Sequence, residues 1–271
     1  MPKIRLDQLL VNRGLCESRE KGKRLILAGE VLVNEVPVTK VGQLLPEDAV
    51  LRVKLPPKFV SRGGLKLEGA LDHFGIEVRD KVCLDIGSST GGFTDCLLQR
   101  GAARVYAFDV GTNQLVWKLR SDPRVVSREN FNVRHMGPAD VGEPVDLVVA
   151  DVSFISLTLV LPPAFEVLQP GGNAVVLIKP QFELSKDEVG KGGIVRDPAL
   201  HQKACAKIEK FIKDMAESGG GTGGAIRSEN SGGLGKSRSL VQWRGSVESP
   251  IQGTDGNREF FAWISVAHAG A

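Results

Sequence analysis

The chain has 271 residues, of which 42% are hydrophobic, enough for one catalytic domain with a sizeable core and a small companion domain. No apolar run is long enough to span a bilayer, and the first residues lack the apolar core of a signal peptide. Four cysteines without C-x-x-C spacing and four scattered histidines predict a cytoplasmic protein with reduced thiols and no metal site.

The net charge of +3 is distributed unevenly along the chain. Residues 1–58 contain eleven Lys and Arg against seven Asp and Glu, a balance of +4, so the remainder carries about −1. A basic segment attached to a near-neutral body indicates a polyanion partner, although charge alone is equally compatible with a solvated basic face.

Residues 1–54 show a pattern that differs from the rest of the chain. Ser18 is the expected N-cap of a helix that Gly29 ends, and residues 55–58 are the expected linker. The expected elements are a helix over 5–11 that ends at Gly14, a helix over 19–28, a hairpin of 31–33 with 36–38, and a strand over 49–54.

This segment resembles the alpha-L RNA-binding module of ribosomal protein S-four, pseudouridine synthases and tyrosyl-tRNA synthetases. The resemblance rests on Arg5-Leu6-Asp7, Arg13-Gly14, Ser18-Arg19, Gly29 and residues 31–34. It implies a small α+β RNA-binding domain over 1–58. A helix face that carries Arg and Lys suits RNA phosphates, which give affinity rather than base identity. The expected RNA-binding residues are Arg5, Arg13, Arg19, Lys21, Lys23 and Arg24.

From about Val60 onward, helical and strand patterns alternate, which predicts a mostly parallel sheet with helices on both faces. Helices are expected over 65–74, 92–99, 115–119, 157–168 and 201–217. Strands are expected over 82–86, 105–109, 125–127, 145–150, 174–178 and 260–266. The glycine-rich segment 218–242 is expected to be a flexible insertion.

A glycine-rich turn follows the expected strand 82–86, and an acidic residue, Asp109, ends the next strand. A strand, a glycine-rich loop, a helix, a second strand and an acid are typical of a nucleoside-cofactor site in an open α/β sheet, where the acid binds ribose hydroxyls. The alternative is a glycine-rich turn in an ordinary α/β protein.

The residues around the turn favour one cofactor. The dinucleotide pattern G-x-G-x-x-G is absent, and Asp85 just before the loop would repel a pyrophosphate. A ligand with a cationic amino acid group and a sulfonium fits better, which indicates S-adenosylmethionine. The expected cofactor-binding residues are Asp85, Gly87, Ser88, Gly91, Gly92, Phe93, Asp109, Val110, Asn130 and Asp151.

Four polar residues, Asp85, Asp109, Asp151 and Lys179, lie at expected strand ends. Ligands of open parallel sheets bind beyond these ends, so one shared cleft is expected. A lysine at the edge of a buried sheet is usually paired or functional, and a purely structural salt bridge is the alternative for Lys179. Asp151 is expected to neutralise Lys179, to hold the methyl-bearing end of the cofactor, or both.

The chain also resembles the TlyA family of ribosomal RNA ribose 2′-O-methyltransferases, often labelled hemolysin A, whose catalytic half is similar to FtsJ-type methyltransferases. The matching segments are 61–66, 85–95, 109–111, 151–156, 179–183, 190–197 and 249–260. The resemblance implies a Rossmann-like, S-adenosylmethionine-dependent methyltransferase domain over 59–271. In one place the chain departs from the family pattern, because about two dozen residues precede 243–245 where a short turn is usual.

The family's Lys-Asp-Lys-Glu tetrad falls on Lys66, Asp151, Lys179 and Glu259. Taken alone, Lys66 indicates a solvated helix lysine and Glu259 the start of an edge strand. The resemblance implies methyl transfer to a ribose hydroxyl, typically of cytidine, in ribosomal RNA or ribosomal subunits. The nucleotide and the oligomeric state stay open.

The residue types suit this reaction. A lysine takes a proton from a ribose 2′-hydroxyl only in its neutral form, which burial or a neighbouring cation favours. Lys179 is the expected base, Lys66 the neighbouring cation, and Asp151 and Glu259 the residues that orient them. The alternatives are a non-catalytic RNA-binding factor and a pore-forming cytolysin, although no amphipathic strand array supports the latter.

Overall fold

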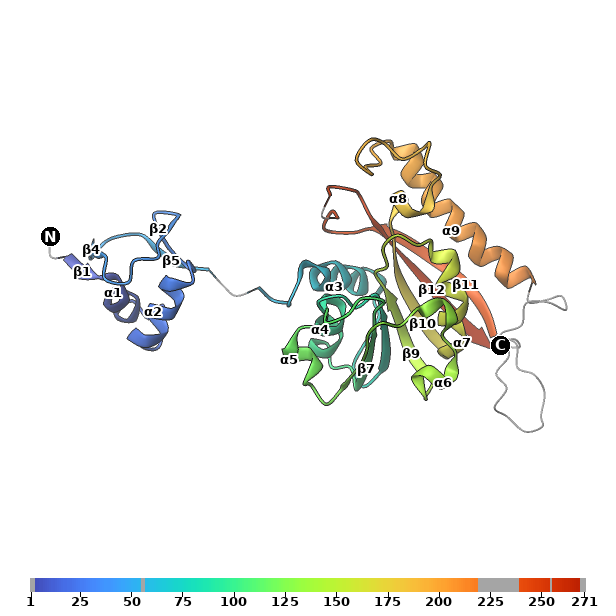
Figure 1. Ribbon diagram of the computed structural model, residues 1–271, viewed down its shortest axis with the longest axis horizontal. Helices are drawn as coiled ribbons and strands as arrows, with labels where there is room; N and C mark the ends of the chain where they lie inside the picture. Colours follow the sequence, from blue (N-terminus) through green and yellow to red (C-terminus); the bar gives the residue numbers. More distant parts are fainter. Residues whose placement is uncertain (1–2, 55–56, 219–238, 254, 269–271) are drawn as a thin grey trace. The chain divides into compact units, whose positions relative to one another are not determined.

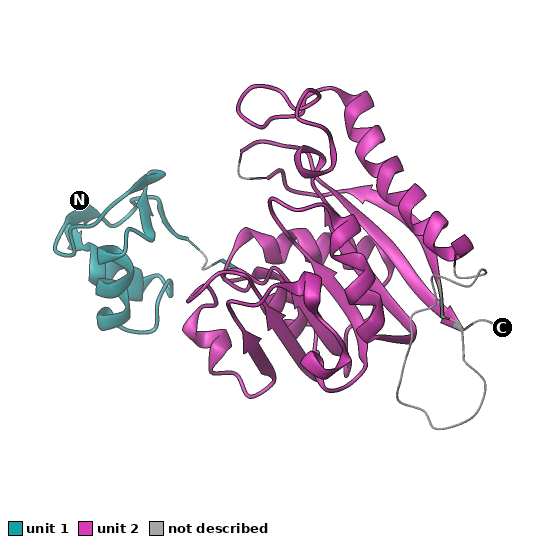
Figure 2. Ribbon diagram, turned by 45° about the vertical axis from the view of Figure 1, so that its right-hand side comes forward, with its two compact units in different colours: residues 1–57 teal, residues 58–271 magenta. Residues whose placement is uncertain are grey.

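The computed structural model describes residues 3–54, 57–218, 239–253 and 255–268. The chain divides into two compact units, Met1–Pro57 and Lys58–Ala271, which are coloured separately in Figure 2. No helix within the described ranges is long and apolar enough to cross a membrane.

The first unit is a small α+β domain. Its elements are β1 (Lys3–Arg5), α1 (Leu6–Asn12), α2 (Arg19–Leu27), β2 (Val31–Val33), β3 (Val36–Pro37), β4 (Leu44–Pro46) and β5 (Leu51–Val53). The predicted N-cap is confirmed, because the Ser18 side chain accepts the Lys21 N–H. The predicted hairpin is also confirmed, since β2 pairs with β3 and on its other side with β5. Strands β1 and β4 were not predicted, because three residues are too few to show alternation.

The second unit is built on a seven-stranded sheet (Figure 1). Its strands are β6 (Val82–Ile86), β7 (Arg104–Phe108), β8 (Val125–Arg128), β9 (Val145–Ala150), β10 (Leu168–Ile178), β11 (Ser239–Glu248) and β12 (Phe260–His268). They lie in the order β11-β12-β10-β9-β6-β7-β8. The five strands from β10 to β8 are parallel, whereas β12 is antiparallel to both of its neighbours. The predicted mostly parallel sheet is confirmed.

Helices cover both faces of this sheet, as predicted. The helices are α3 (Arg62–Phe74), α4 (Gly92–Gln99), α5 (Trp117–Arg120), α6 (Pro138–Val141), α7 (Leu161–Val167), α8 (Pro180–Glu183) and α9 (Pro198–Ser218), with 3-10 turns η1 (Val133–His135) and η2 (Leu157–Leu159). Alternate residues of each central strand enter different cores: Cys83 packs with α3 and α4, and Leu84 packs with α7 and α9. This two-sided burial explains why the parallel strands are continuous apolar runs.

Several element boundaries differ from the prediction. Helix α3 begins at Arg62, three residues before the predicted start, and its N-cap Ser61 has an extended backbone. The predicted helix 157–168 is interrupted at Val160 between η2 and α7. Strand β10 begins at Leu168 and shifts register before Asn173, where the Pro-Gly-Gly sequence interrupts pairing. Helices α6 and α8 are single turns, too short for a periodic pattern.

The predicted insertion over 218–242 is shorter at both ends than the sequence indicated. Ser218 is the last residue of α9, and residues 239–242 belong to β11. Strand β11 is stabilised by nine residue pairs with β12 and by Val241, which is buried in the core that α9 covers. Residues 219–238 lie outside the described residues.

Candidate active site

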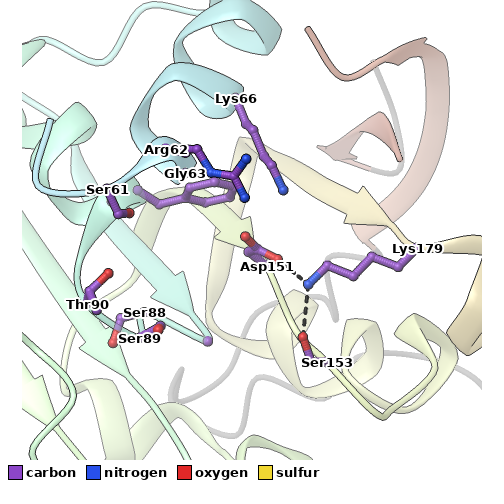
Figure 3. Close-up of a pocket in the computed structure, with 13 residues that line it drawn as sticks. Ser61, Arg62, Gly63, Lys66, Ser88, Ser89, Thr90, Asp151, Ser153 and Lys179 are labelled. Atoms are coloured by element: carbon purple, nitrogen blue, oxygen red, sulfur yellow. Dashed lines mark hydrogen bonds and ion pairs between the residues drawn. The ribbon is translucent and has the colours of Figure 1, made fainter. Parts of the chain in front are cut away.

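A pocket lies at the carboxyl ends of β6, β9 and β10, beside the first turn of α3 (Figure 3). Of the predicted site residues, it brings together Lys66, Gly87, Ser88, Gly92, Phe93, Asp151 and Lys179. It is also lined by residues that the site prediction omitted: Ser61, Arg62, Gly63, Ser89, Thr90 and Ser153. The remaining predicted residues of this unit lie outside the lining: Asp85, Gly91, Asp109, Val110, Asn130 and Glu259.

Lys179 follows β10 and extends to the end of β9, where Asp151 lies (Figure 3). Its Nζ is 2.6 Å from Asp151 Oδ1 and donates a hydrogen bond of 2.9 Å to Ser153 Oγ. The two strands are neighbours in the sheet, so this ion pair follows from the topology once both residues occupy strand ends. The expectation that Asp151 neutralises Lys179 agrees with this geometry.

Lys66 enters the same pocket from helix α3 (Figure 3). Its Nζ is 2.5 Å from Glu259 Oε2, and both side chains are almost completely buried. Glu259 directly precedes β12, in a segment that packs closely against α3: a Cβ added at Gly69 would lie 2.8 Å from Pro250. A Cβ at Gly253 would lie 2.6 Å from the other carboxylate oxygen of Glu259, so this glycine leaves room for the carboxylate.

The segment that carries Glu259 is also fixed by a buried amide. The Asn257 side chain accepts the Val195 N–H at 2.9 Å and donates to the Gly193 carbonyl at 2.9 Å. Its main-chain carbonyl accepts the Gly253 N–H. Asn257 therefore joins two segments that the sequence resemblance had marked separately, 190–197 and 249–260.

The glycine-rich loop after β6 is shaped by close contacts. Gly87 has φ +80°, and a Cβ there would lie 2.5 Å from the Asp151 carbonyl oxygen. The N–H groups of Gly87 and Ser88 both donate to the Phe108 carbonyl of β7. Gly91, with φ +98°, leaves no room for a Cβ beside Leu119. The glycines at 87 and 91 are therefore required both by conformation and by space.

Asp85 is the fourth of the five residues of β6, just before this loop, and it is completely buried. Its Oδ2 accepts a hydrogen bond of 2.6 Å from Thr94 Oγ1, and its Oδ1 has no hydrogen-bond partner among the described residues. Burial raises the pKa of Asp85 to about 7; the Thr94 hydrogen bond opposes this rise, and the nearby charges of Asp151 and Asp109 add to it. Buried carboxylate oxygens normally accept a hydrogen bond, so Oδ1 can accept one from a cationic group or an N–H group of a ligand.

Asp109 follows β7 at the other side of the glycine-rich loop. Its two oxygens accept the N–H groups of Ser89, at 2.7 Å, and Gly111, at 2.6 Å. A carboxylate has further lone pairs, so these bonds orient it and leave acceptor capacity for hydroxyl groups. Val110 and Asn130 are exposed nearby, and the Asn130 N–H donates to the Gly111 carbonyl.

Glu129, which the site prediction omitted, fixes the chain beyond Asp109. Its carboxylate accepts the N–H groups of Asn113, Gln114 and Leu115 and pairs with Arg120 at 2.6 Å. The backbone hydrogen bond from Leu115 is the largest of the effects that lower the pKa of Glu129 to about 2. An acidic residue two positions after the predicted strand 125–127 was the sequence feature that could have marked Glu129 as part of the site.

Phe154 is the most exposed large apolar residue next to the pocket, with 91% of its surface accessible. Its φ is +63°, and its ring centre lies 5.1 Å from that of Phe182. The Lys179 Nζ lies 6.0 Å from the Phe182 ring centre. An aromatic face is therefore available beside the lysine. Phe154 belongs to the family segment 151–156 and had no predicted role.

The predicted RNA-binding cations of the first unit are largely held by carboxylates of the same unit. Arg5 and Arg19 both bind the buried Asp7, at 3.0 and 2.8 Å. Burial raises the pKa of Asp7, but the hydrogen bonds from Arg19 and Arg5 outweigh it and lower the pKa overall. Of the other four, Arg13 donates to two carbonyls, Lys21 and Lys23 pair with Glu17 and Glu20, and Arg24 is exposed.

Comparison with known families identifies both units. Residues 59–232 match the family model described as FtsJ-like methyltransferase, and residues 4–51 match the S4 domain. The first match covers more than half of the chain. The chain is therefore a methyltransferase of the FtsJ-like family that carries an S4 domain at its N-terminus, which confirms the predicted fold class.

Individual relatives narrow this class. The chain is 49% identical over 261 residues to "Putative rRNA methyltransferase YqxC" of Bacillus subtilis, covering 95% of this chain and 84% of that protein. It is 40% identical over 266 residues to "16S/23S rRNA (cytidine-2'-O)-methyltransferase TlyA" of Mycobacterium tuberculosis, covering 97% and 90%. A solved structure, "Putative hemolysin from Streptococcus thermophilus", matches with 42% identity and a TM-score of 0.68, covering 98% and 90%. The chain belongs to the TlyA family.

Proposed function

We propose that this protein transfers a methyl group from S-adenosylmethionine to a ribose 2′-hydroxyl, that of a cytidine, in ribosomal RNA. The observation that carries the proposal is the Lys179 amine, held between Asp151 and Ser153 in a pocket that Lys66 and the glycine-rich loop also line. The family membership and the relative named as an rRNA (cytidine-2'-O)-methyltransferase support the substrate class.

The residues present fit the proposed cofactor. Asp85 Oδ1 is a buried acceptor without a donor among the described residues, which suits an ammonium group nearby, and Gly87 lets the loop pack closely against the Asp151 backbone. Asp109 is held in place to accept ribose hydroxyls, and the exposed Val110 and Asn130 are the groups proposed for the adenine side. Gly91, Gly92 and Phe93 complete the loop and the first turn of α4.

The chemistry assigned to the chain is a proton transfer and the orientation of two reactants. When bound, S-adenosylmethionine supplies a methyl group that its sulfonium already activates, so in-line positioning is the main remaining task. The Lys179 amine accepts the proton of the 2′-hydroxyl while the hydroxyl oxygen forms its bond to the methyl carbon and the carbon–sulfur bond breaks. Asp151 holds the lysine, and the buried Lys66–Glu259 pair places a second amine in the pocket.

The RNA-binding role is proposed for residues 1–58, and the methyl transfer for 59–271. The S4 match and the basic balance of the first unit support phosphate contacts there. The exposed Phe154 ring contacts the Phe182 ring, which Lys179 Nζ approaches, so Phe154 offers a face for an unstacked base near the lysine. A ribosomal RNA substrate supports the proposal that the reaction takes place in the cytoplasm.

The test is methyl transfer from radiolabelled S-adenosylmethionine to ribosomal subunits from cells that lack this protein. We expect label in a 2′-O-methylcytidine with the wild-type chain and none with Lys179→Ala. Calorimetry should show S-adenosylmethionine binding by both proteins. Subunits that bind the protein but receive no label would contradict the proposal and favour a non-catalytic RNA-binding factor.

A further inference from the structure

Ser153 lies at the pocket beside the amine of Lys179 (Figure 3). Its Oγ accepts a hydrogen bond of 2.9 Å from Lys179 Nζ, and the same Nζ is 2.6 Å from Asp151 Oδ1. The nitrogen has three tetrahedral positions besides its bond to Cε. The hydrogen bond to Ser153 occupies one of them, whereas the contact with Asp151 Oδ1 is an ion pair without hydrogen-bond geometry.

The neutral amine that accepts a proton has two N–H bonds and one lone pair. When one N–H bond points at Ser153 Oγ, the amine no longer rotates freely about the Cε–Nζ bond, and the lone pair is confined to the two other positions. Without Ser153, no hydrogen bond among the described residues restricts this rotation, because the Asp151 contact lacks hydrogen-bond geometry. We infer that Ser153 is a positioning residue that restricts the direction of the Lys179 lone pair in favour of the 2′-hydroxyl proton, an inference that rests on the proposed function.

The loop that carries Ser153 is held at its far end by Glu183 of α8. The Glu183 side chain is buried, and its two oxygens accept Ser156 Oγ–H at 2.6 Å and the Leu157 N–H at 2.8 Å. Lys207 of α9 balances its charge at 3.0 Å. Because Lys179 is the N-cap of α8, Glu183 fixes the Ser153 loop against the segment that bears the lysine.

Phe154 adds a second constraint directly beside Ser153. Its φ of +63° lies in the left-handed region, which a bulky residue adopts only where its surroundings impose it. Its ring contacts Phe182, on the same short helix as Glu183. The loop therefore contacts α8 at two points, through Phe154 and through Ser156.

The test compares Ser153→Ala with Ser153→Thr, which keeps the hydroxyl, and with Ser121→Ala, an exposed serine at the end of α5, as the matched control. Ser153 is exposed, so removal of its oxygen leaves the core intact. In single-turnover methyl transfer to ribosomal subunits, we expect Ser153→Ala to lower the rate constant roughly tenfold, the effect of one hydrogen bond to an ionisable amine. The KM for RNA and the Kd for S-adenosylmethionine should stay unchanged, and Ser153→Thr should recover most of the rate.

A second measurement does not depend on activity. The NMR order parameter of the Lys179 Cε group, assigned with Lys179→Arg and measured in the full chain without RNA, should fall in Ser153→Ala. It should be unchanged in Ser121→Ala and recovered in Ser153→Thr.

Wild-type rate and wild-type side-chain order in Ser153→Ala would overturn the inference. An increased KM for RNA at unchanged kcat would overturn it as well, because Ser153 would then be an RNA contact. If the wild-type chain methylates no ribosomal RNA, the proposed function fails, and the NMR comparison still decides whether Ser153 orders Lys179.

Discussion

The two lysine–carboxylate pairs of the pocket differ in burial and in what else they contact. The side chains of Lys66 and Glu259 are 10% and 4% exposed, and residues 193 positions apart in the chain form this pair. Lys179 and Asp151 are 11% and 23% exposed, and Lys179 has a further hydrogen bond to Ser153. The closed pair, Lys66–Glu259, joins two distant segments of the fold. The two lysines are about equally buried, so the other pair is more open at its carboxylate, Asp151, and differs also by the hydrogen bond to Ser153.

Replacement of Lys179 should show the functional difference between the two pairs most clearly. Lys179→Ala removes the proposed base, so we expect methyl transfer to fall by about a thousandfold or more, within the usual range for general-base catalysis. S-adenosylmethionine binding and the melting temperature should change little, because this pair is partly open to solvent. Lys213→Ala, at an exposed ion pair of α9, is the control, and its activity should match the wild type. Substantial activity in Lys179→Ala would assign the base elsewhere.

Loss of one partner of the closed pair should cost stability. Glu259→Ala leaves the Lys66 ammonium buried without its carboxylate, and we expect the free energy of unfolding to fall by about 3–5 kcal/mol in chemical denaturation. The double variant Lys66→Met/Glu259→Leu should regain most of this stability and remain inactive. Glu248→Ala breaks an exposed pair with Arg258 and should cost less than about 1 kcal/mol. Equal losses in Glu259→Ala and Glu248→Ala would contradict the contrast in burial.

Asp85 extends the comparison to a carboxyl that no lysine pairs with among the residues that the structure describes. Burial raises its pKa from 3.8 to about 7. A carboxyl with a raised folded-state pKa contributes stability that is complete below about pH 4 and lost as the pH rises through 7. Its contribution to the free energy of unfolding should therefore fall by about 1.4 kcal/mol per pH unit across this window.

Urea denaturation of the wild type and Asp85→Asn between pH 4 and 8 measures this contribution as the difference between the two proteins. The wild type should lose stability relative to Asp85→Asn as the pH rises, whereas Asp72→Asn, at an exposed carboxylate, should show no such trend. Parallel curves for the wild type and Asp85→Asn would show that Asp85 is ionised throughout.

The predicted RNA-binding cations of the first unit are much more exposed than the pocket lysines. Arg24→Ala should weaken binding to ribosomal RNA only a few-fold and reduce the slope of log K against log salt by roughly one, the effect of one phosphate contact. Arg52→Ala, at an exposed pair with Glu35 in the same unit, is the control. Filter binding at several salt concentrations measures both; identical slopes for the wild type and Arg24→Ala would remove Arg24 from the RNA interface.

The local parts of the site were accessible to prediction. The strand 82–86, the glycine-rich loop and the helix 92–99 each depend on residues adjacent in the chain, and the structure has β6 and α4 at these residues. Lys179 and Asp151 were placed at strand ends around one cleft from apolar runs alone, because the ends of parallel strands share one edge, and the structure shows that their strands are neighbours. Element ends were less accurate, as at α3 and β11, because caps and sheet edges depend on packing partners distant in the chain.

The sequence by itself determined the strand-and-helix order, the two-sided burial of the sheet and the turn at Gly87, since each follows from residue pattern and backbone conformation over a few positions. The residue pattern alone indicated a solvated helix lysine at Lys66 and the start of an edge strand at Glu259, and the family resemblance assigned both to a tetrad without showing which residues meet. Only the tertiary structure decided that these two meet at 2.5 Å, that Asn257 joins two distant segments, and that Ser153 faces Lys179. These contacts depend on the packing of α3, the β9–α7 loop and the 249–259 segment, which no local pattern encodes.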